Sequence, residues 1–215
     1  MAKKERQTIR PLSDDNDYFH LGGVVGQGQA SAVHRGDTNQ PTAFILAGGM
    51  SQRMGRDKAL LKIHGRTMLQ LIRATAVAAG FGVRVIRRDN IKPCGPLSGV
   101  LTAFSRSRAP ELVFLSCDMP FVTADLLRGL LRQRSEAVFV CSGGRAGFPF
   151  KVARGFVPTI ERRVKSGSYS IQGLADEPGA LRWRPRMAGL SVLTNINTPE
   201  EWNRATARIG ALQDY

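Results

Sequence analysis

From Pro41 onward, the chain alternates short apolar runs with segments of helical periodicity. The runs lack apolar–polar alternation, which is typical of strands that are buried on both faces of a sheet. Strands are therefore predicted at residues 42–47, 83–86, 112–116, 137–141 and 190–194. Helices are predicted between them at residues 67–79, 96–105, 123–134, 155–165 and 169–174.

A last helix has a clear start signal. Thr198 can cap it, Pro199 suits its first position and Glu201 its third. The alternation of strands and helices predicts an α/β fold with a mostly parallel sheet over residues 41–215. Residues 1–40 differ, since they are rich in Asp, Asn, Gln, Gly and Ser and have only short apolar runs. This composition predicts a flexible N-terminal tail.

The positive charge belongs to the predicted domain. The chain has 31 Lys and Arg against 17 Asp and Glu, a formal net charge of +14, and the five basic and five acidic side chains of residues 1–41 cancel. A field of this sign attracts polyanions. The basic residues are scattered and no nucleic-acid-binding motif accompanies them. We therefore expect a small phosphorylated substrate, or simply a basic soluble surface, rather than nucleic acid.

Two further features concern the compartment. No apolar run approaches the roughly 18–20 residues of a membrane helix, and the first residues lack the apolar stretch of a secretory signal. The three cysteines, Cys94, Cys117 and Cys141, lie far apart and form no CxxC, which argues against a disulfide framework or a zinc site. We expect a cytoplasmic protein with no membrane partner.

A glycine-containing loop, LAGGMSQRMGRDK from Leu46 to Lys58, follows the first predicted strand directly. In doubly wound sheets, ligands bind beyond the carboxyl ends of the strands. Gly48 and Gly49 let the backbone approach a phosphate, and Arg53 and Lys58 can neutralise a triphosphate. The loop is neither a Walker A sequence nor a GxGxxG fingerprint. It predicts a phosphate-binding loop of another kind.

A carboxylate follows the predicted strand at 112–116. Asp118, in the segment SCDMP, would point into the same crevice as the glycine loop. Mg²⁺ prefers carboxylate oxygen and is commonly held by one or two carboxylates plus substrate phosphates. Asp118 is therefore a candidate magnesium ligand, and the alternative is an Asp that caps a helix or stabilises a turn.

Two other polar positions are candidates. Asn197, in the segment NINTP, can hydrogen-bond a substrate or a metal-bound water, or it can cap the turn. Asp89 precedes the Gly95-Pro96 pair that opens a predicted helix. That helix start could lie near an anion, or it could be a plain tight turn.

Four segments in this order, LAGGMSQRMGRDKALL, DNIKPCGPLSGV, FLSCDMPFV and NINTPEEW, resemble the molybdenum cofactor guanylyltransferases, which are MobA-like nucleotidyltransferases. The resemblance runs from about Pro41 to about Trp202. It implies a three-layer, Rossmann-like nucleotidyltransferase fold. It also implies transfer of GMP from GTP to molybdenum cofactor with Mg²⁺, giving molybdopterin guanine dinucleotide and pyrophosphate. Molybdoenzyme clients or cofactor-delivery proteins would be possible partners.

The resemblance implies roles for single residues as well. The positions that contact the nucleotide are Leu46, Ala47, Gly48, Gly49, Lys58 and Asp89. The positions near the pterin side are Asn195 and Asn197. The catalytic positions are Arg53, Lys58 and Asp118, of which Asp118 is the magnesium ligand. In the family a His-Pro strand lies beside the substrate. Here Phe148-Pro149-Phe150 takes that place without the His.

One departure from the family concerns the segment before Asp89. The family normally has a full strand and a connector there, whereas residues 80–86 of this chain run almost directly into Asp89. The resemblance therefore predicts a sheet that is one strand short, or one that residues 1–40 complete. Two rival functions stay open, namely a cytidylyltransferase acting on the same cofactor and a catalytically silent protein that binds or carries it. The short segment favours the silent protein, and the intact Arg53, Lys58 and Asp118 argue against it.

Overall fold

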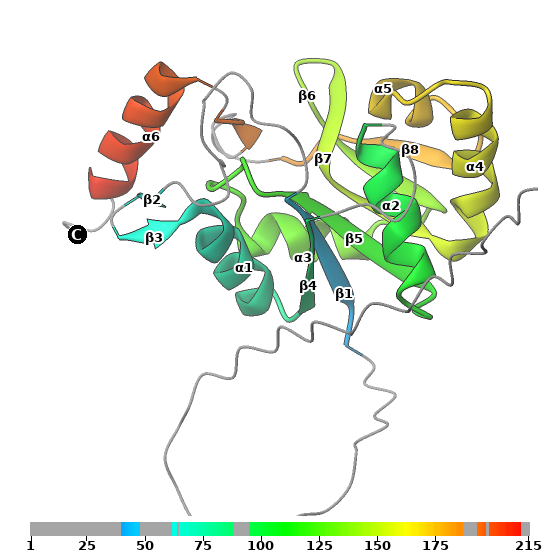
Figure 1. The fold of residues 1–215 in the computed structure, drawn as a ribbon, viewed down its shortest axis with the longest axis horizontal. Helices are drawn as coiled ribbons and strands as arrows, with labels where there is room; N and C mark the ends of the chain where they lie inside the picture. Colours follow the sequence, from blue (N-terminus) through cyan, green and yellow to red (C-terminus); the bar gives the residue numbers. More distant parts are fainter. Residues whose placement is uncertain are drawn as a thin grey trace, which may run out of the picture. The chain divides into compact units, whose positions relative to one another are not determined.

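The computed structural model describes residues 40–47, 62–63, 65–87, 95–186, 193–196 and 198–211. A six-stranded sheet lies at the centre of this part, in the order β4-β1-β5-β7-β6-β8 (Figure 1). Its strands are β1 Thr42–Leu46, β4 Gly82–Ile86, β5 Glu111–Ser116, β6 Ala137–Ser142, β7 Arg145–Ala153 and β8 Ala180–Trp183. β1 is parallel to β4 and β5, and β6 is parallel to β8, whereas β7 is antiparallel to both of its neighbours.

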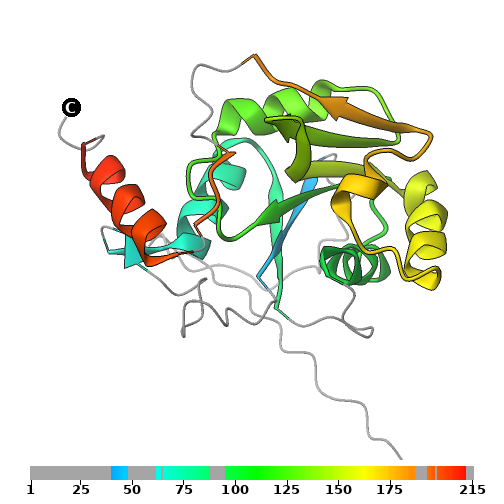
Figure 2. The same ribbon diagram turned by 90° about the horizontal axis from the view of Figure 1, so that it is seen from above.

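Helices cover both faces of the sheet (Figure 2). One face packs against α1 Met68–Ala78 and α3 Ala124–Arg132, and the other against α2 Pro96–Ser105, α4 Val157–Lys165 and α5 Ile171–Leu174. Strand β5 shows why a continuous apolar run fits this arrangement. Its residues Leu112 and Phe114 join the core under α2, and Val113 and Leu115 join the core under α1 and α3. The prediction of a three-layer α/β fold is confirmed.

The C-terminal helix α6 Pro199–Ala211 begins as the sequence predicts. The Thr198 hydroxyl accepts a hydrogen bond from the Glu201 N–H at 3.2 Å, and the Glu201 carboxylate accepts one from the Thr198 N–H at 3.1 Å. Two short strands, β2 Lys62–Ile63 and β3 Arg66–Thr67, form a separate small sheet. A short 3-10 helix at Arg154–Phe156 precedes α4.

Two predictions about strands need comment. The predicted strand at 190–194 lies largely outside the described residues, and Leu193, which is described, has 3-10 helical backbone instead. Between α1 and α2, β4 is the one strand that the described residues contain, and it pairs directly with β1. The predicted tail, residues 1–40, lies outside the described part except for Gln40.

A row of phenylalanines crosses the sheet on the face that α2 covers. Phe44, Phe114, Phe150 and Phe139 come from β1, β5, β7 and β6, and the strand register places each opposite the next. Their ring centroids are 6.4, 5.1 and 5.2 Å apart along the row, and all four side chains are buried. This row ties the parallel and antiparallel parts of the sheet into one core.

Each helix in the described ranges lacks the length or the apolar content needed to cross a lipid bilayer.

Candidate active site

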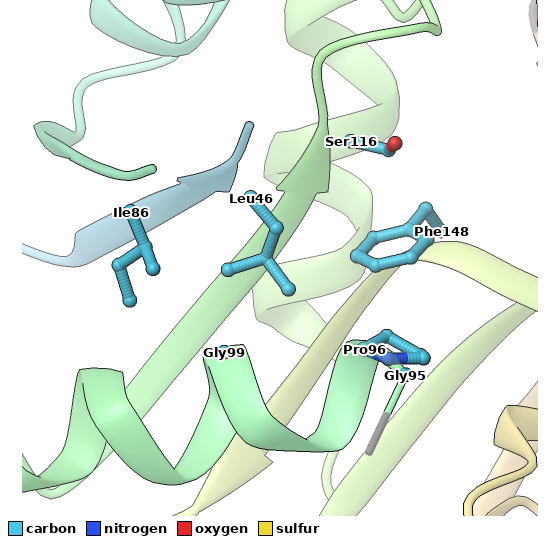
Figure 3. A pocket seen from close by; sticks show the side chains of 7 residues that line it. All are labelled: Leu46, Ile86, Gly95, Pro96, Gly99, Ser116 and Phe148. Carbon is cyan, nitrogen blue, oxygen red and sulfur yellow. The ribbon is translucent and has the colours of Figure 1, made fainter. Parts of the chain in front are cut away.

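A small pocket opens at the carboxyl ends of three parallel strands (Figure 3). Leu46, Ile86 and Ser116 end β1, β4 and β5, and the register pairs Leu46 with both of the others. All three line the pocket, with Phe148 from β7 as a further wall. The cavity volume is about 120 Å³. Because typical ligand pockets hold about 300–1,000 Å³, this cavity would accept one ring of a larger ligand.

The start of α2 closes another side of the pocket. Gly95 precedes the helix with φ of +64°, a conformation that favours glycine, and Pro96 opens the helix. One turn later, a Cβ on Gly99 would lie 3.0 Å from both methyl groups of Leu46. Glycine at this position therefore lets α2 approach β1 closely, and any larger side chain would displace Leu46 or enter the pocket.

Asp118 lies in the turn just after β5, next to this pocket. Its Oδ1 accepts a hydrogen bond from the Ser116 hydroxyl at 2.5 Å, and its side chain is partly exposed. Asp118 does not cap the following helix, because the Thr123 hydroxyl accepts the hydrogen bond from the Leu126 N–H at the start of α3. The carboxylate is thus held just beyond the carboxyl end of β5, and it does not cap α3.

The segment around Asn195 approaches Asp118 from another part of the chain. The Ile196 N–H donates a hydrogen bond to the Asp118 carbonyl at 2.9 Å, and the Ile196 side chain is buried. The neighbouring Asn195 is exposed. This contact places Asn195 beside the Asp118 turn, as expected if both belong to one site.

The described residues include only part of the predicted site. Leu46, Ala47, Asp118 and Asn195 are described, and the Ala47 N–H donates to the Ile86 carbonyl at 2.8 Å. The six remaining predicted positions, Gly48, Gly49, Arg53, Lys58, Asp89 and Asn197, lie outside the described residues. Leu46 and Ala47 therefore lie at the carboxyl end of β1, and Asp118 lies just beyond the carboxyl end of the adjacent strand β5.

Sequence reasoning missed several pocket residues, of which Ser116 is the most informative. Ser116 and Asp118 are two positions apart at the end of a strand, a spacing that puts side chains on the same side in extended chain. This spacing is the local feature of the sequence that could have identified Ser116 as a neighbour of Asp118. Ile86 and Gly99 carry no local signal, since they reach the pocket through strand pairing and helix packing.

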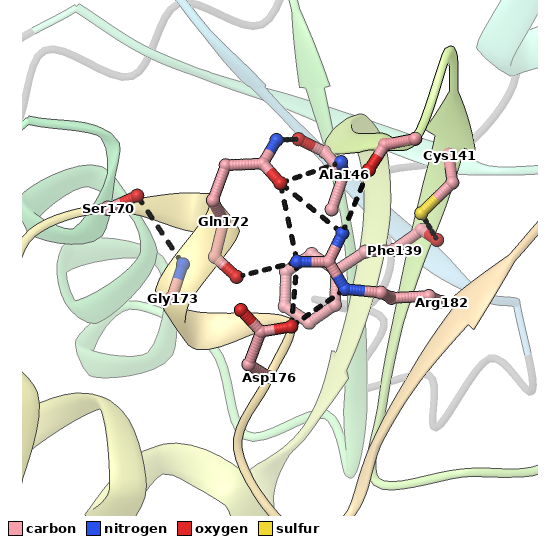
Figure 4. Close-up of polar contacts among 9 residues, drawn as sticks. Phe139, Cys141, Ala146, Ser170, Gln172, Gly173, Asp176 and Arg182 are labelled. Atoms are coloured by element: carbon pink, nitrogen blue, oxygen red, sulfur yellow. Dashed lines mark hydrogen bonds and ion pairs between the residues drawn. The ribbon is translucent and has the colours of Figure 1, made fainter.

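The Phe148 wall belongs to the β6–β7 hairpin, which a polar network anchors to α5 (Figure 4). The Gln172 amide accepts a hydrogen bond from the Ala146 N–H at 3.1 Å and donates one to the Ala146 carbonyl at 2.5 Å. Arg182 of β8 donates to the Gln172 carbonyl at 3.1 Å and pairs with the Asp176 carboxylate at 2.8 Å. The hairpin is thus fixed two residues away from the pocket wall.

Replacing Arg182 by alanine is expected to lower the free energy of unfolding by about 1–2 kcal/mol, because it removes charge-assisted hydrogen bonds of a guanidinium that is two-thirds buried. Amide hydrogen exchange of residues 143–148 should quicken more than exchange elsewhere. Arg145→Ala is the control, since Arg145 is exposed on the same hairpin and should change stability by less than about 0.5 kcal/mol. Equal effects of the two substitutions would contradict an anchoring role for Arg182.

Proteins of known name or structure are similar to most of this chain. The molybdenum cofactor guanylyltransferase of Shewanella sp. (strain MR-4) is 28% identical over 203 residues, covering 79% of this chain and 97% of the relative. The crystal structure of molybdopterin-guanine dinucleotide biosynthesis protein A from Archaeoglobus fulgidus has a TM-score of 0.65 at 18% identity, covering 79% of this chain and 99% of its own. The 2-C-methyl-D-erythritol 4-phosphate cytidylyltransferase of Thermus thermophilus has a TM-score of 0.61 at 17% identity, covering 79% and 98%.

The two structural likenesses concern the fold, which is that of nucleotidyltransferases. The family model described as the MobA-like NTP transferase domain matches residues 43–177, more than half of the chain. That span contains β1 from its second residue onward, the residues that line the pocket and Asp118. The chain therefore belongs to the MobA-like NTP transferase family and is a nucleotidyltransferase.

Proposed function

We propose that this chain transfers GMP from GTP to molybdenum cofactor, forming molybdopterin guanine dinucleotide and pyrophosphate. The observation that carries the proposal is the placement of the Asp118 carboxylate beside a pocket at the carboxyl ends of β1, β4 and β5. The curated relative from Shewanella, which is named a molybdenum cofactor guanylyltransferase and which this chain covers almost entirely, supports the choice of substrates.

The pocket suits the flat ring of a nucleotide. Leu46, Ile86, Pro96 and Phe148 give it apolar walls, and Ser116 adds a polar group. Apolar walls with a few polar groups are usual for sites that bind planar heterocycles. A base seated there would direct its phosphates along the edge of the sheet, toward the loop that follows β1 and toward Asp118.

The reaction would be one direct displacement. An oxygen of the cofactor's terminal phosphate attacks the α-phosphorus of GTP and forms a new phosphorus–oxygen bond. The bond between the α-phosphorus and the oxygen bridging to the β-phosphate breaks, and pyrophosphate leaves with that electron pair. Arg53 and Lys58 would stabilise the negative charge that builds up on the leaving group. No covalent enzyme intermediate is needed, because the attacking phosphate is already an anionic nucleophile.

Asp118 fits a magnesium ion of the kind that such sites use. Its partly exposed carboxylate is a hard oxygen donor, and among the described residues only Oδ1 has a hydrogen-bond partner. The described residues contain no group of three or more His, Cys, Asp or Glu that could hold a metal by themselves. Mg²⁺ is commonly held by one or two carboxylates and by substrate phosphates. When bound, Mg²⁺ would neutralise phosphate charge.

The proposal predicts GTP-dependent pyrophosphate release. Purified protein, molybdenum cofactor and Mg²⁺ would be incubated with GTP or CTP in parallel, and pyrophosphate and the dinucleotide product would be measured. Release with GTP and not with CTP supports the proposal, whereas a CTP preference would assign the cytidylyltransferase activity instead. Folded protein that binds the cofactor but releases no pyrophosphate with either nucleotide would overturn the proposed reaction in favour of a carrier.

A further inference from the structure

Ser116 is the one described residue that both lines the pocket and contacts the Asp118 carboxylate. It is the last residue of β5, it lines the pocket together with Leu46 and Phe148 (Figure 3), and its hydroxyl donates to Asp118 Oδ1 at 2.5 Å. We propose that Ser116 is a positioning residue, which orients the Asp118 carboxylate for the metal ion that accompanies the nucleotide phosphates. This inference rests on the proposed function.

The hydrogen bond determines which carboxylate oxygen is available. A hydroxyl that donates to Oδ1 holds the carboxylate in one rotamer and leaves Oδ2 as the oxygen without a described partner. Carboxylates that bind metals are commonly oriented in this way by neighbouring donors, and removal of the donor typically lowers metal affinity 10–100-fold. Ser116 would therefore act on the metal through Asp118 and not by direct contact.

The backbone of the Asp118 turn is fixed independently of Ser116. The Asp118 carbonyl accepts from the Ile196 N–H at 2.9 Å, and the Met119 carbonyl accepts from the Val122 N–H at 3.3 Å. Removing the Ser116 hydroxyl would therefore release the Asp118 side chain while the turn keeps its place. For this reason we expect Ser116→Ala to fold normally and to differ from wild type in how strongly metal supports nucleotide binding.

The test compares the dissociation constant of GTP in EDTA with that in Mn²⁺, in the absence of molybdenum cofactor. The ratio of the two constants reports how much the metal strengthens nucleotide binding, and it does not depend on turnover. In Ser116→Ala this ratio should fall by about tenfold or more. Ser116→Thr keeps the hydroxyl and should restore it, since any effect of the added methyl group on the pocket changes both constants and cancels in the ratio.

Two further variants make the result specific. Ser135→Ala removes a hydroxyl that donates to the Gly179 carbonyl at 2.7 Å. This contact lies near the start of β8, which pairs with β6 on the side away from β7. The ratio of the two GTP dissociation constants should therefore equal that of wild type. Asp118→Ala should lose the metal effect altogether. The electron paramagnetic resonance spectrum of Mn²⁺ in the GTP complex should differ between Ser116→Ala and wild type, whereas a purely structural role would leave it unchanged.

The outcomes separate this inference from the function on which it rests. A metal effect that is lost in Asp118→Ala but retained in Ser116→Ala would overturn the role of Ser116 alone. A loss in Ser116→Ala that Ser116→Thr does not restore would also overturn it, because the hydroxyl would then not be the cause. Wild-type protein that fails to bind GTP with Mn²⁺ would overturn the proposed function and this inference together.

Discussion

Replacing Asp118 by alanine is expected to reduce nucleotidyl transfer about a hundredfold to a thousandfold. The carboxylate is the charged group that the structure places beside the pocket at the carboxyl edge of the sheet. Removal of one preorganised charge contact typically costs about 3–4 kcal/mol of transition-state stabilisation. The measurement is the rate of pyrophosphate release at saturating GTP, cofactor and Mg²⁺. Turnover close to wild type would remove Asp118 from the proposed site.

The substitution should act on the reaction and not on the fold. The Asp118 side chain is partly exposed and does not cap α3, so its loss should leave the unfolding midpoint almost unchanged. Asp125→Ala is a matched control, since Asp125 lies seven positions later in the chain, is 88% exposed and, among the described residues, forms an ion pair with Arg128 alone. That variant should keep full activity. A large loss of stability in Asp118→Ala would mean that lost activity reports unfolding instead.

The parallel core of the fold could be predicted from the sequence for a clear physical reason. β1 and β5 are buried on both faces, and continuous apolar runs such as the one that precedes Ser116 are typical of strands buried in this way. Helices α1, α2 and α3 follow from their periodicity and from Gly80 and Pro96 at their ends. The carboxyl ends of adjacent parallel strands meet at one edge, which is why Leu46 and Asp118 could be placed together in advance.

The antiparallel part could not be predicted locally. β7 contains Pro149 and Lys151, and both argue against an interior strand. In the structure, Pro149 lies where the pairing of β6 and β7 shifts register between Phe139 and Val140, so its missing N–H interrupts the ladder at an irregular point. Lys151 is buried but pairs with Glu111 across the strands at 2.6 Å. The partner of Lys151 lies 40 positions away in the sequence, and the irregularity at Pro149 depends on how β6 and β7 pair.

The site prediction contains motif residues and omits most of the residues that line the pocket, because the two kinds of residue differ in what the sequence records. Motif residues such as Asp118 carry chemistry that can be recognised in the sequence. Pocket residues such as Ile86 and Phe148 are ordinary apolar side chains, and only pairing and packing bring them to the strand ends. Gln172 and Arg182 lie further still from any motif, although they anchor the hairpin that carries Phe148. Tertiary contacts decide these roles, and no local pattern records them.

Replacing Phe150 by alanine is expected to lower the free energy of unfolding by about 3–5 kcal/mol. Phe150 is fully buried in β7, between Phe114 and Phe139 of the cross-sheet row, with centroids 5.1 and 5.2 Å away. Its removal leaves a cavity and breaks two aromatic contacts that join the parallel and antiparallel strands. Urea unfolding followed by circular dichroism would measure the change. A loss below about 1 kcal/mol would show that the row contributes little to stability.

The same substitution should weaken the pocket, because the Phe148 ring packs against Phe150 at 4.9 Å. Phe150→Leu provides the comparison, since it keeps most of the buried volume while removing the ring. It should cost less stability than alanine and leave more of the support beneath Phe148. If Phe148 forms the wall for the nucleotide ring, the loss of GTP affinity should follow the same order, with alanine worse than leucine. A contrary result would be that both variants bind GTP as wild type does, although Phe150→Ala is strongly destabilised. In that case the nucleotide would not bind against Phe148, and the stability of the core would not determine GTP affinity.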